Sequence, residues 1–419
     1  MMRLPRKTIY ETLGREPVHP FPARMAPGIA LEVMEEAKTP LRVLDPMMGS
    51  GTVLAMARSK GHRAIGVDID PLAVLISKVW TTAIDAEAVR HKAAQVLERA
   101  RGILSTLSAC DAYPRHADIE TRRFVKYWFD EYARRQLTSL ATAIERVRDN
   151  AIRDALWCGF SRLIITKQSG ASLAMDLAHS RPHKAFDRAP TKPFRKFLAA
   201  VDRVVKNCLD KRSAGRGPAT ATHEGDARNI PLEDASVDLV LTSPPYLNAI
   251  DYMRCSKFSL VWMGHNISKL RRIRAASVGT EVGRGAPQVD KDIGDIIAGL
   301  NLRPPLAARE QAVLAQYVHD IRRALGEVAR VLTPGGRAVY VVGENTVRGT
   351  YIRNASIVTI AASLSGLMLC GRRTRALPSD RRCLPPPSVR SHSAPLDARV
   401  RREVVLSFAK PMVRRGRHA

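Results

Sequence analysis

The residues best suited to chemistry in this chain are Ser243, Pro244, Pro245 and Tyr246, which follow the apolar run 237–242. The prolines fix φ and remove amide donors, so nearby carbonyl groups point outward without local donors that compete for them. The Pro244 carbonyl and the Ser243 hydroxyl can then accept both hydrogens of a planar amine, with the Tyr246 ring stacked on the ring that carries it. The stretch predicts a site for an exocyclic amino group. The alternative interpretation is a proline-rich loop after a core strand.

A second candidate site lies near the amino terminus, where a strand-like run, 41–45, leads into a glycine-rich turn and a helical pattern begins at Val53. This order is typical of nucleotide-type sites, because glycines let a ligand approach the backbone and the helix start offers free N–H groups. The turn lacks the third glycine of the dinucleotide fingerprint and opens with Asp45 and Pro46. Both features argue against NAD.

The next strand-like run, 63–68, ends in Asp68, at the spacing expected for a contact with a ribose hydroxyl. Asp70 has a different predicted role. With Pro71 in the first turn of the following helix, it is well placed to cap that helix. We therefore assign ribose binding to Asp68 and capping to Asp70.

Together the two sites resemble the amino-methyltransferases that use S-adenosyl-L-methionine. In that family D-P-x-x-G-S-G-T cradles the methionine part of the cofactor, and [D/N/S]-P-P-[Y/F/W] holds the target amine. The resemblance implies that Asp226, followed by Ala227, contacts the cofactor adenine from the strand before the catalytic one, and that Phe21 packs beside the methionine moiety. The implied cofactor-binding residues of the glycine turn are Asp45, Pro46, Gly49, Ser50, Gly51 and Thr52.

The resemblance covers about 15–82 and 222–410, and the residues after Tyr246 also look like site-specific DNA methyltransferases, the modification enzymes of restriction–modification. In such a reaction the exocyclic amine is a poor nucleophile, because its lone pair is delocalised into the ring. Hydrogen bonds accepted from both of its hydrogens localise that lone pair for in-line attack at about 3 to 3.5 Å. The chain has no Pro-Cys dipeptide, which disfavours methylation of a cytosine ring carbon.

Composition indicates a polyanionic partner. The 419 residues include 67 Lys and Arg against 40 Asp and Glu, a formal net charge of +27. Coding bias is the alternative explanation, but it does not by itself produce such an imbalance of sign, so we favour nucleic acid. Six scattered cysteines without a C-x-x-C pair argue against a metal site and a disulfide framework. The absence of a long apolar run argues against secretion and membrane insertion and favours a cytoplasmic protein.

The order of elements predicts an α/β protein with a Rossmann-like class I methyltransferase sheet, mostly parallel with an antiparallel final strand. The expected catalytic domain is split between 1–84 and 216–410, around a helical insertion at 85–215, and a basic tail follows at 411–419. Helices are predicted at 27–38, 86–107, 122–147, 194–209, 310–331 and 354–366, a turn at 333–336, and a closing hairpin from 367–373 and 403–409.

The insertion is the predicted target-recognition region, although the family often places recognition elsewhere in the chain. Its predicted phosphate contacts are Lys167, Arg181, His183 and Lys184. The aromatic side chains of 124–129 are at helical spacing and are expected in the core rather than stacked on bases. The Arg-rich tail either holds phosphates or is a solvated end.

Three functions remain open at this stage. The first is a DNA methyltransferase acting on an exocyclic base amine, with N4 of cytosine favoured over N6 of adenine because family members with that reaction often carry S-P-P-Y. The second is an RNA enzyme, such as one acting on guanine N2 of transfer RNA. The third is an inactive methyltransferase fold that binds nucleic acid. The sequence does not indicate the oligomeric state.

Overall fold

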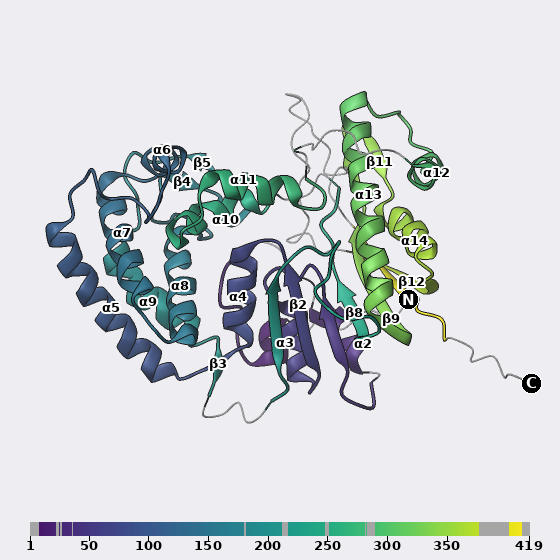
Figure 1. The fold of residues 1–419 in the computed structure, drawn as a ribbon, viewed down its shortest axis with the longest axis horizontal. Helices are drawn as coiled ribbons and strands as arrows, with labels where there is room; N and C mark the ends of the chain where they lie inside the picture. Colours follow the sequence, from purple (N-terminus) through teal and green to yellow (C-terminus); the bar gives the residue numbers. More distant parts are fainter. Residues whose placement is uncertain are drawn as a thin grey trace, which may run out of the picture.

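The computed structural model describes residues 8–21, 25, 27–35, 37–179, 182–211, 217–247, 251–280, 282, 290–376 and 402–412. A seven-stranded sheet with the order β12-β13-β9-β8-β1-β2-β7 lies in the middle of Figure 1. Its strands are β1 (Arg42–Asp45), β2 (Arg63–Asp68), β7 (Thr220–Glu224), β8 (Val237–Thr242), β9 (Leu332–Gly343), β12 (Met368–Ala376) and β13 (Arg402–Ala409). Neighbours from β7 to β9 are parallel, whereas β13 is antiparallel to β9 and β12. The predicted mostly parallel sheet with an antiparallel final strand is confirmed, and so is the closing hairpin.

Helices cover both faces of the sheet, because successive residues of each strand point to opposite sides. Val43 packs with α2 and α3 in one buried cluster, whereas its neighbour Leu44 packs with α12, α13 and α14 in another. The helices of these two layers are α2 (Pro27–Glu35), α3 (Thr52–Ser59), α12 (Lys291–Gly299), α13 (Ala308–Val331) and α14 (Asn354–Leu364). The sheet is therefore buried on both sides.

A helical lobe follows β2 and α4 (Pro71–Thr81), on the left of Figure 1. Its helices are α5 (Ala86–Thr106), α6 (Ile119–Trp128), α7 (Glu131–Glu145), α8 (Asn150–Ile164) and α9 (Pro193–Val205). Its short strands and 3-10 turn are β4 (Ala174–Met175), η1 (Leu177–His179) and β5 (His183–Lys184). At its base β3 (Ala83–Ile84) pairs in parallel with β6 (Leu209–Asp210), which brings the two ends of the lobe together.

The predicted single helix at 122–147 is wrong, because the chain breaks between α6 and α7. The Asp130 side chain accepts a hydrogen bond from the Ala133 amide and caps α7, so the backbone at Asp130 is extended. The predicted turn at 333–336 is also corrected. These residues belong to β9, whose register against β8 shifts between Val237 and Leu239, and Gly335 takes a φ of +80° there.

The aromatic residues of α6 join the helical lobe to the elements that follow β8. Phe124 lies edge-on to Phe258 of α10 (Met253–Leu260), with ring centroids 5.2 Å apart. Phe129 packs in the same way against Trp262 of η2 (Val261–Met263) at 5.4 Å. The expected core role of these aromatics is confirmed, except that Tyr127 is 56% exposed.

The remaining elements are α1 (Ile9–Leu13), α11 (Ile267–Ala276) and the hairpin of β10 (Asn345–Val347) and β11 (Thr350–Ile352). Within the described residues no helix combines the length and apolar character needed to cross a membrane. The same part of the chain holds no group of three or more His, Cys, Asp or Glu side chains placed to ligate a metal ion.

Candidate active site

The glycine turn and the double-proline turn open at the same edge of the sheet. Strands β1 and β8 are parallel neighbours, with Leu44 opposite Val240, so Asp45 and Thr242 end side by side. The Thr242 hydroxyl donates a hydrogen bond of 2.7 Å to the Asp45 carboxylate. In the sheet β1 lies between β2, the next strand along the chain, and β8, which comes much later. Such a switch point is where open α/β sheets bind ligands, outside the carboxyl ends of their strands.

The glycine turn has a backbone that favours glycine at two positions. Gly49 and Gly51 have φ of +50° and +82°, in the left-handed region. A Cβ on Gly51 would lie 2.2 Å from the Ser77 hydroxyl of α4, so the start of α3 can approach α4 this closely only with glycine. The Thr52 hydroxyl is buried beside this turn and has no hydrogen-bond partner among the described residues. A polar ligand group at the start of α3 would satisfy it.

The predicted capping role of Asp70 is confirmed, and Asp68 lies at the end of β2. The Asp68 carboxylate accepts hydrogen bonds from the Gly49 amide at 2.8 Å and the Asp70 amide at 2.9 Å, which ties the end of β2 to the glycine turn. The Asp70 side chain caps α4 through the Leu72 amide at 2.9 Å. It also accepts a hydrogen bond of 2.5 Å from the Ser256 hydroxyl, so α10 is tied to the start of α4.

Three carboxyl groups therefore lie around the glycine turn, with Asp45 and Asp70 buried and Asp68 half-buried. Burial raises the pKa of Asp45 to about 7, although the Thr242 hydroxyl partly opposes this. Burial likewise raises the pKa of Asp70 to about 7, with a further contribution from nearby Asp68. The pKa of Asp68 is also raised by burial. Carboxyl groups in this state favour a cationic ligand, because positive charge nearby stabilises their ionised forms.

In the double-proline turn, the Pro244 carbonyl and the Ser243 hydroxyl are both available to accept hydrogen bonds. The Ser243 hydroxyl donates to the Val341 carbonyl of β9 at 3.0 Å and lies 3.5 Å from the Tyr246 hydroxyl, so at least one of its lone pairs remains available as an acceptor. The Tyr317 hydroxyl of α13 donates to the Pro245 carbonyl at 3.3 Å. No described residue donates to the Pro244 carbonyl. The Pro245 carbonyl therefore already accepts a hydrogen bond within the protein, whereas the Pro244 carbonyl can accept one from a ligand.

Tyr246 is held by the strands on its far side. A Cβ on Gly343, the last residue of β9, would lie 2.6 Å from the Tyr246 ring, so the ring packs directly on that glycine. The Tyr246 hydroxyl donates to the Glu403 carboxylate of β13 at 3.4 Å. Arg375 of β12 in turn donates to Glu403 at 2.8 Å. Sequence analysis missed Glu403 and Gly343, because their contacts join segments far apart in the chain.

Asp226 and Ala227 lie just beyond the end of β7 rather than within it, which corrects the predicted strand. The Asp226 carboxylate accepts a hydrogen bond of 2.6 Å from the buried Arg228 guanidinium, which also pairs with Asp320 of α13. Burial alone would raise the pKa of Asp226, but the hydrogen bonds from Arg228 lower it. Ala227 is buried beside it. Sequence analysis did not identify Arg228 as a positioning residue.

Phe21 and the predicted phosphate contacts lie in different environments. Phe21 is buried and stacks on Tyr252, with ring centroids 5.6 Å apart. The predicted contacts Lys167, His183 and Lys184 belong to the helical lobe, Lys167 on the segment after α8 and the other two on β5. His183 and Lys184 are exposed. Arg181 lies outside the described residues.

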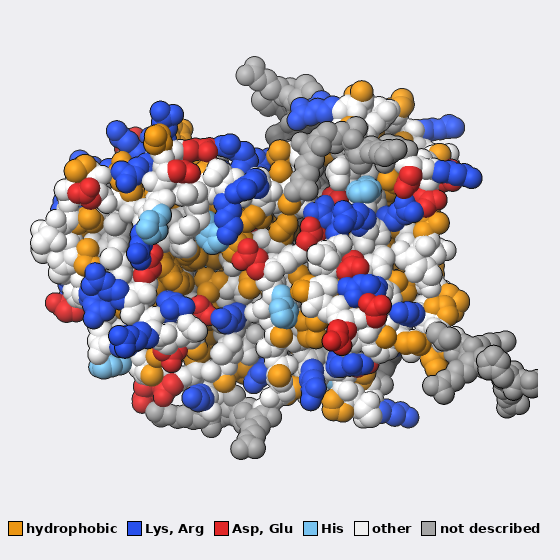
Figure 2. All heavy atoms as spheres, viewed as in Figure 1, with side chains coloured by type: hydrophobic (Ala, Val, Ile, Leu, Met, Phe, Trp, Pro, Cys, Tyr) orange, Lys and Arg blue, Asp and Glu red, His pale blue; other side chains and the backbone are white. Residues whose placement is uncertain are grey.

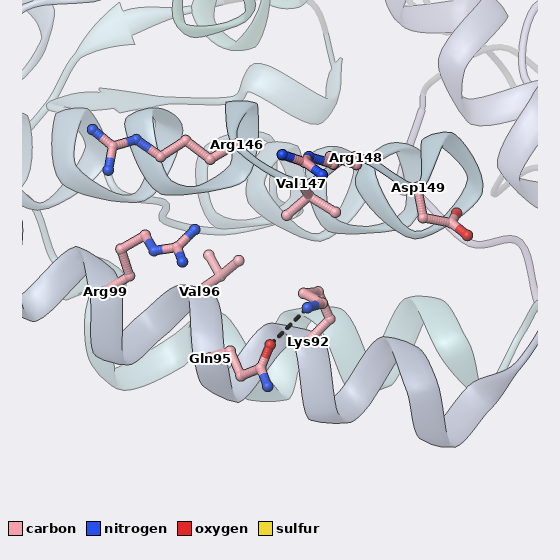
Figure 3. Close-up of a pocket in the computed structure, with 8 residues that line it drawn as sticks. All are labelled: Lys92, Gln95, Val96, Arg99, Arg146, Val147, Arg148 and Asp149. Carbon is pink, nitrogen blue, oxygen red and sulfur yellow. Dashed lines mark hydrogen bonds between the residues drawn. The ribbon is translucent and has the colours of Figure 1, made fainter.

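Two cavities among the described residues lie away from these strand ends. The first, about 290 Å³, lies between α5 and the junction of α7 and α8. Figure 3 shows that its walls include Lys92, Arg99, Arg146 and Arg148. The second, about 330 Å³, lies at the opposite edge of the sheet, beside Leu41 and the start of β8. The candidate site is therefore defined by the turns at the carboxyl ends of the strands.

Comparison with known sequences finds Type II methyltransferases as relatives. No family model matches the chain. It is 24% identical over 359 residues to the Type II methyltransferase M.MvaI of Kocuria varians, covering 79% of this chain and 77% of that protein. It is 25% identical over 251 residues to the Type II methyltransferase M.AvaI of Nostoc sp., covering 55% of this chain and 49% of that protein.

A solved structure of a DNA modification methylase of Thermus thermophilus, complexed with S-adenosyl-L-methionine, is 18% identical to this chain. That match covers 45% of this chain and 51% of the other, with a TM-score of 0.23. The resemblance to site-specific DNA methyltransferases, inferred from the two motifs, is confirmed by the Type II relatives.

Proposed function

We propose that this protein is a site-specific DNA methyltransferase that transfers a methyl group from S-adenosyl-L-methionine to an exocyclic base amine. The observation that carries the proposal is the hydrogen bond of 2.7 Å between Thr242 and Asp45. It joins the ends of β1 and β8, so the turn suited to the cofactor and the turn suited to the amine are neighbours. The similarity to Type II methyltransferases supports DNA as the substrate.

The residues of the glycine turn fit S-adenosyl-L-methionine. The first amides of α3 and the unpartnered Thr52 hydroxyl suit a carboxylate, because both are donors at a helix N-terminus. The carboxyl groups of Asp45 and Asp68, whose pKa values are raised, suit the cationic groups of the same ligand. When bound, the cofactor supplies an electrophilic methyl group on a positively charged sulfur.

The chain's own residues prepare the amine. The Ser243 hydroxyl and the Pro244 carbonyl accept hydrogen bonds from its two hydrogens, which localises the nitrogen lone pair. After the methyl transfer the cationic amine loses one proton to solvent. The target base must leave the DNA stack to reach this turn, at a cost of a few kcal/mol. Stacking on Tyr246 offsets roughly 1–3 kcal/mol of that cost. A serine hydroxyl accepts more weakly than a carboxylate does. The S-P-P-Y resemblance favours N4 of cytosine over N6 of adenine.

The test is product analysis with competing substrates. The full-length protein is incubated with methyl-labelled cofactor, duplex genomic DNA from an unmodified host and total RNA, and each digest is examined by mass spectrometry. N4-methylcytosine in the DNA is the expected product. N6-methyladenine would correct the base but retain the function, whereas labelled RNA with unlabelled DNA would refute the proposal. If the protein binds the cofactor but labels neither polymer, the methyltransferase assignment is wrong.

A further inference from the structure

We propose that α10 and α11 form a surface that binds the phosphate backbone of duplex DNA beside the double-proline turn, an inference that rests on the proposed DNA substrate. We call it the α10–α11 surface and define it by its cationic side chains, Arg254, Lys257, Lys269, Arg271, Arg272 and Arg274. Lys and Arg side chains gather over the position of α11 in Figure 2. The described phosphate contacts predicted from the sequence belong to other elements, the segment after α8 and β5.

Two carboxylates face these six cations. Asp251 accepts from Arg254 at 3.2 Å and from Arg274 at 2.5 Å, so one acid is shared by two guanidinium groups. Glu120 of α6 pairs with Arg271. The positive charge of the surface therefore exceeds the negative charge that the neighbouring elements supply.

The remaining cations form no salt bridge within the described residues. Lys269 and Arg272 are exposed on α11. Lys257 is half-buried, with its ammonium 5.3 Å from the centre of the Phe124 ring. Burial and then the nearby arginines lower the pKa of Lys257. A surplus of like charge held this closely favours a polyanion, which relieves the repulsion and releases its own counterions.

Both ends of α11 are hydrogen-bonded to neighbouring elements. At the start of α11 the Ile267 amide donates to the Thr121 hydroxyl of α6 at 3.0 Å. At its end the Ala276 carbonyl accepts a hydrogen bond of 2.6 Å from Arg228, the residue that holds Asp226. Figure 1 shows α10 and α11 between the helical lobe and the sheet. DNA bound here would lie beside the base-capturing turn.

The spacing of the cations also suits a DNA strand. Lys269 and Arg272 are three residues apart, so they share one face of α11 and lie about 4.5 Å apart along the helix. One strand presents a phosphate about every 3.4 Å of duplex axis, so these two long side chains can reach neighbouring phosphates. An acidic protein partner carries no such regular repeat of charge.

The experiment compares two double variants of the full-length protein. Lys269→Gln with Arg272→Gln removes the two exposed cations of the α10–α11 surface that form no salt bridge within the described chain. Lys92→Gln with Arg148→Gln removes the same charge from the wall of the cavity between α5 and the α7–α8 junction (Figure 3). Binding of each protein to a random-sequence 30-base-pair DNA duplex is measured over a series of salt concentrations. Cofactor binding and thermal unfolding check that both variants fold.

We expect the α11 variant to bind the duplex roughly tenfold or more weakly. We also expect the slope of log K against log salt to become shallower by about two, because each lost phosphate contact removes about 0.9 from it. The cavity variant should bind like the wild type. An equal loss of DNA affinity in both variants, or no loss in either, would refute DNA binding by the α10–α11 surface. The proposal would also be overturned if the α11 variant bound the DNA duplex normally and lost affinity only for an RNA duplex of the same length. Because binding is read separately from methyl transfer, a wild-type protein that binds DNA here but does not methylate it would refute the proposed function and leave the surface standing.

Discussion

The Thr242 hydroxyl lies 2.7 Å from the Asp45 carboxylate, and this bond joins two residues that are 197 positions apart in the chain. Both side chains are buried at the carboxyl ends of neighbouring strands. The same carboxyl group has its pKa raised to about 7 by burial. The contact that brings the two turns together therefore also holds a titratable group beside the proposed cofactor site.

Cofactor affinity should consequently depend on pH near neutrality. A cationic ligand favours the Asp45 carboxylate, whereas below pH 7 the free protein holds this group mostly protonated. Binding then displaces a proton, so affinity should fall as the pH drops from about 8 to about 6, by at most about tenfold per pH unit for each proton released. Titration calorimetry with S-adenosyl-L-methionine in buffers of different ionisation enthalpy measures both quantities.

The matched variant is Thr242→Val, which removes the hydroxyl donor and keeps a similar shape. Since that donor lowers the pKa of Asp45, its loss should move the midpoint of the pH profile upward. The effect should be largest near neutral pH and small well above it. A pH profile identical to that of the wild type would show that Asp45 does not titrate on cofactor binding.

Asp68→Ala should weaken cofactor binding and also lower stability. The Asp68 carboxylate accepts from the Gly49 and Asp70 amides, and burying an amide without its acceptor costs about 1–3 kcal/mol. We expect the dissociation constant of the cofactor to rise about tenfold or more and the melting temperature to fall. Asp68→Asn keeps one acceptor oxygen and should recover stability better than affinity. If the alanine variant binds the cofactor normally, the ribose assignment is wrong.

The local parts of the site could be predicted from the sequence, because their chemistry lies in short contiguous stretches. The glycine turn between β1 and α3, the Asp70 cap and the double-proline turn after β8 are all of this kind. The contacts between distant segments could not. Arg228 meets Asp320 across 92 positions, and Tyr246 meets Glu403 across 157, and no periodic pattern links either pair. The break at Asp130 was missed because the charged pattern of α6 continues into α7.

Gly343→Ala should reduce methyl transfer while the fold and cofactor binding persist. Its φ is not in the left-handed region, so alanine is compatible with the backbone, but the new Cβ would lie 2.6 Å from the Tyr246 ring. The ring must move, and with it the surface on which the base stacks. The initial rate with duplex DNA should fall at least severalfold. Gly326→Ala on α13, where a Cβ meets no atom within 4 Å, is the matched control and should be fully active.

Tyr246→Ala should lose most methyl transfer, because stacking of a base on an aromatic ring contributes roughly 1–3 kcal/mol, equivalent to about 5- to 150-fold in rate or affinity. Binding of S-adenosyl-L-methionine should survive, since Tyr246 belongs to the turn for the amine. Tyr246→Phe separates the ring from the hydroxyl. It keeps the stacking surface and loses the hydroxyl contacts, at 3.4 Å to Glu403 and 3.5 Å to Ser243, so it should retain most activity. Single-turnover rates on duplex DNA, with cofactor affinity measured in parallel, distinguish these outcomes. Full activity of the alanine variant would show that Tyr246 does not contribute to the site. A phenylalanine variant as impaired as the alanine variant would show that the hydroxyl, rather than the ring, is what the reaction needs.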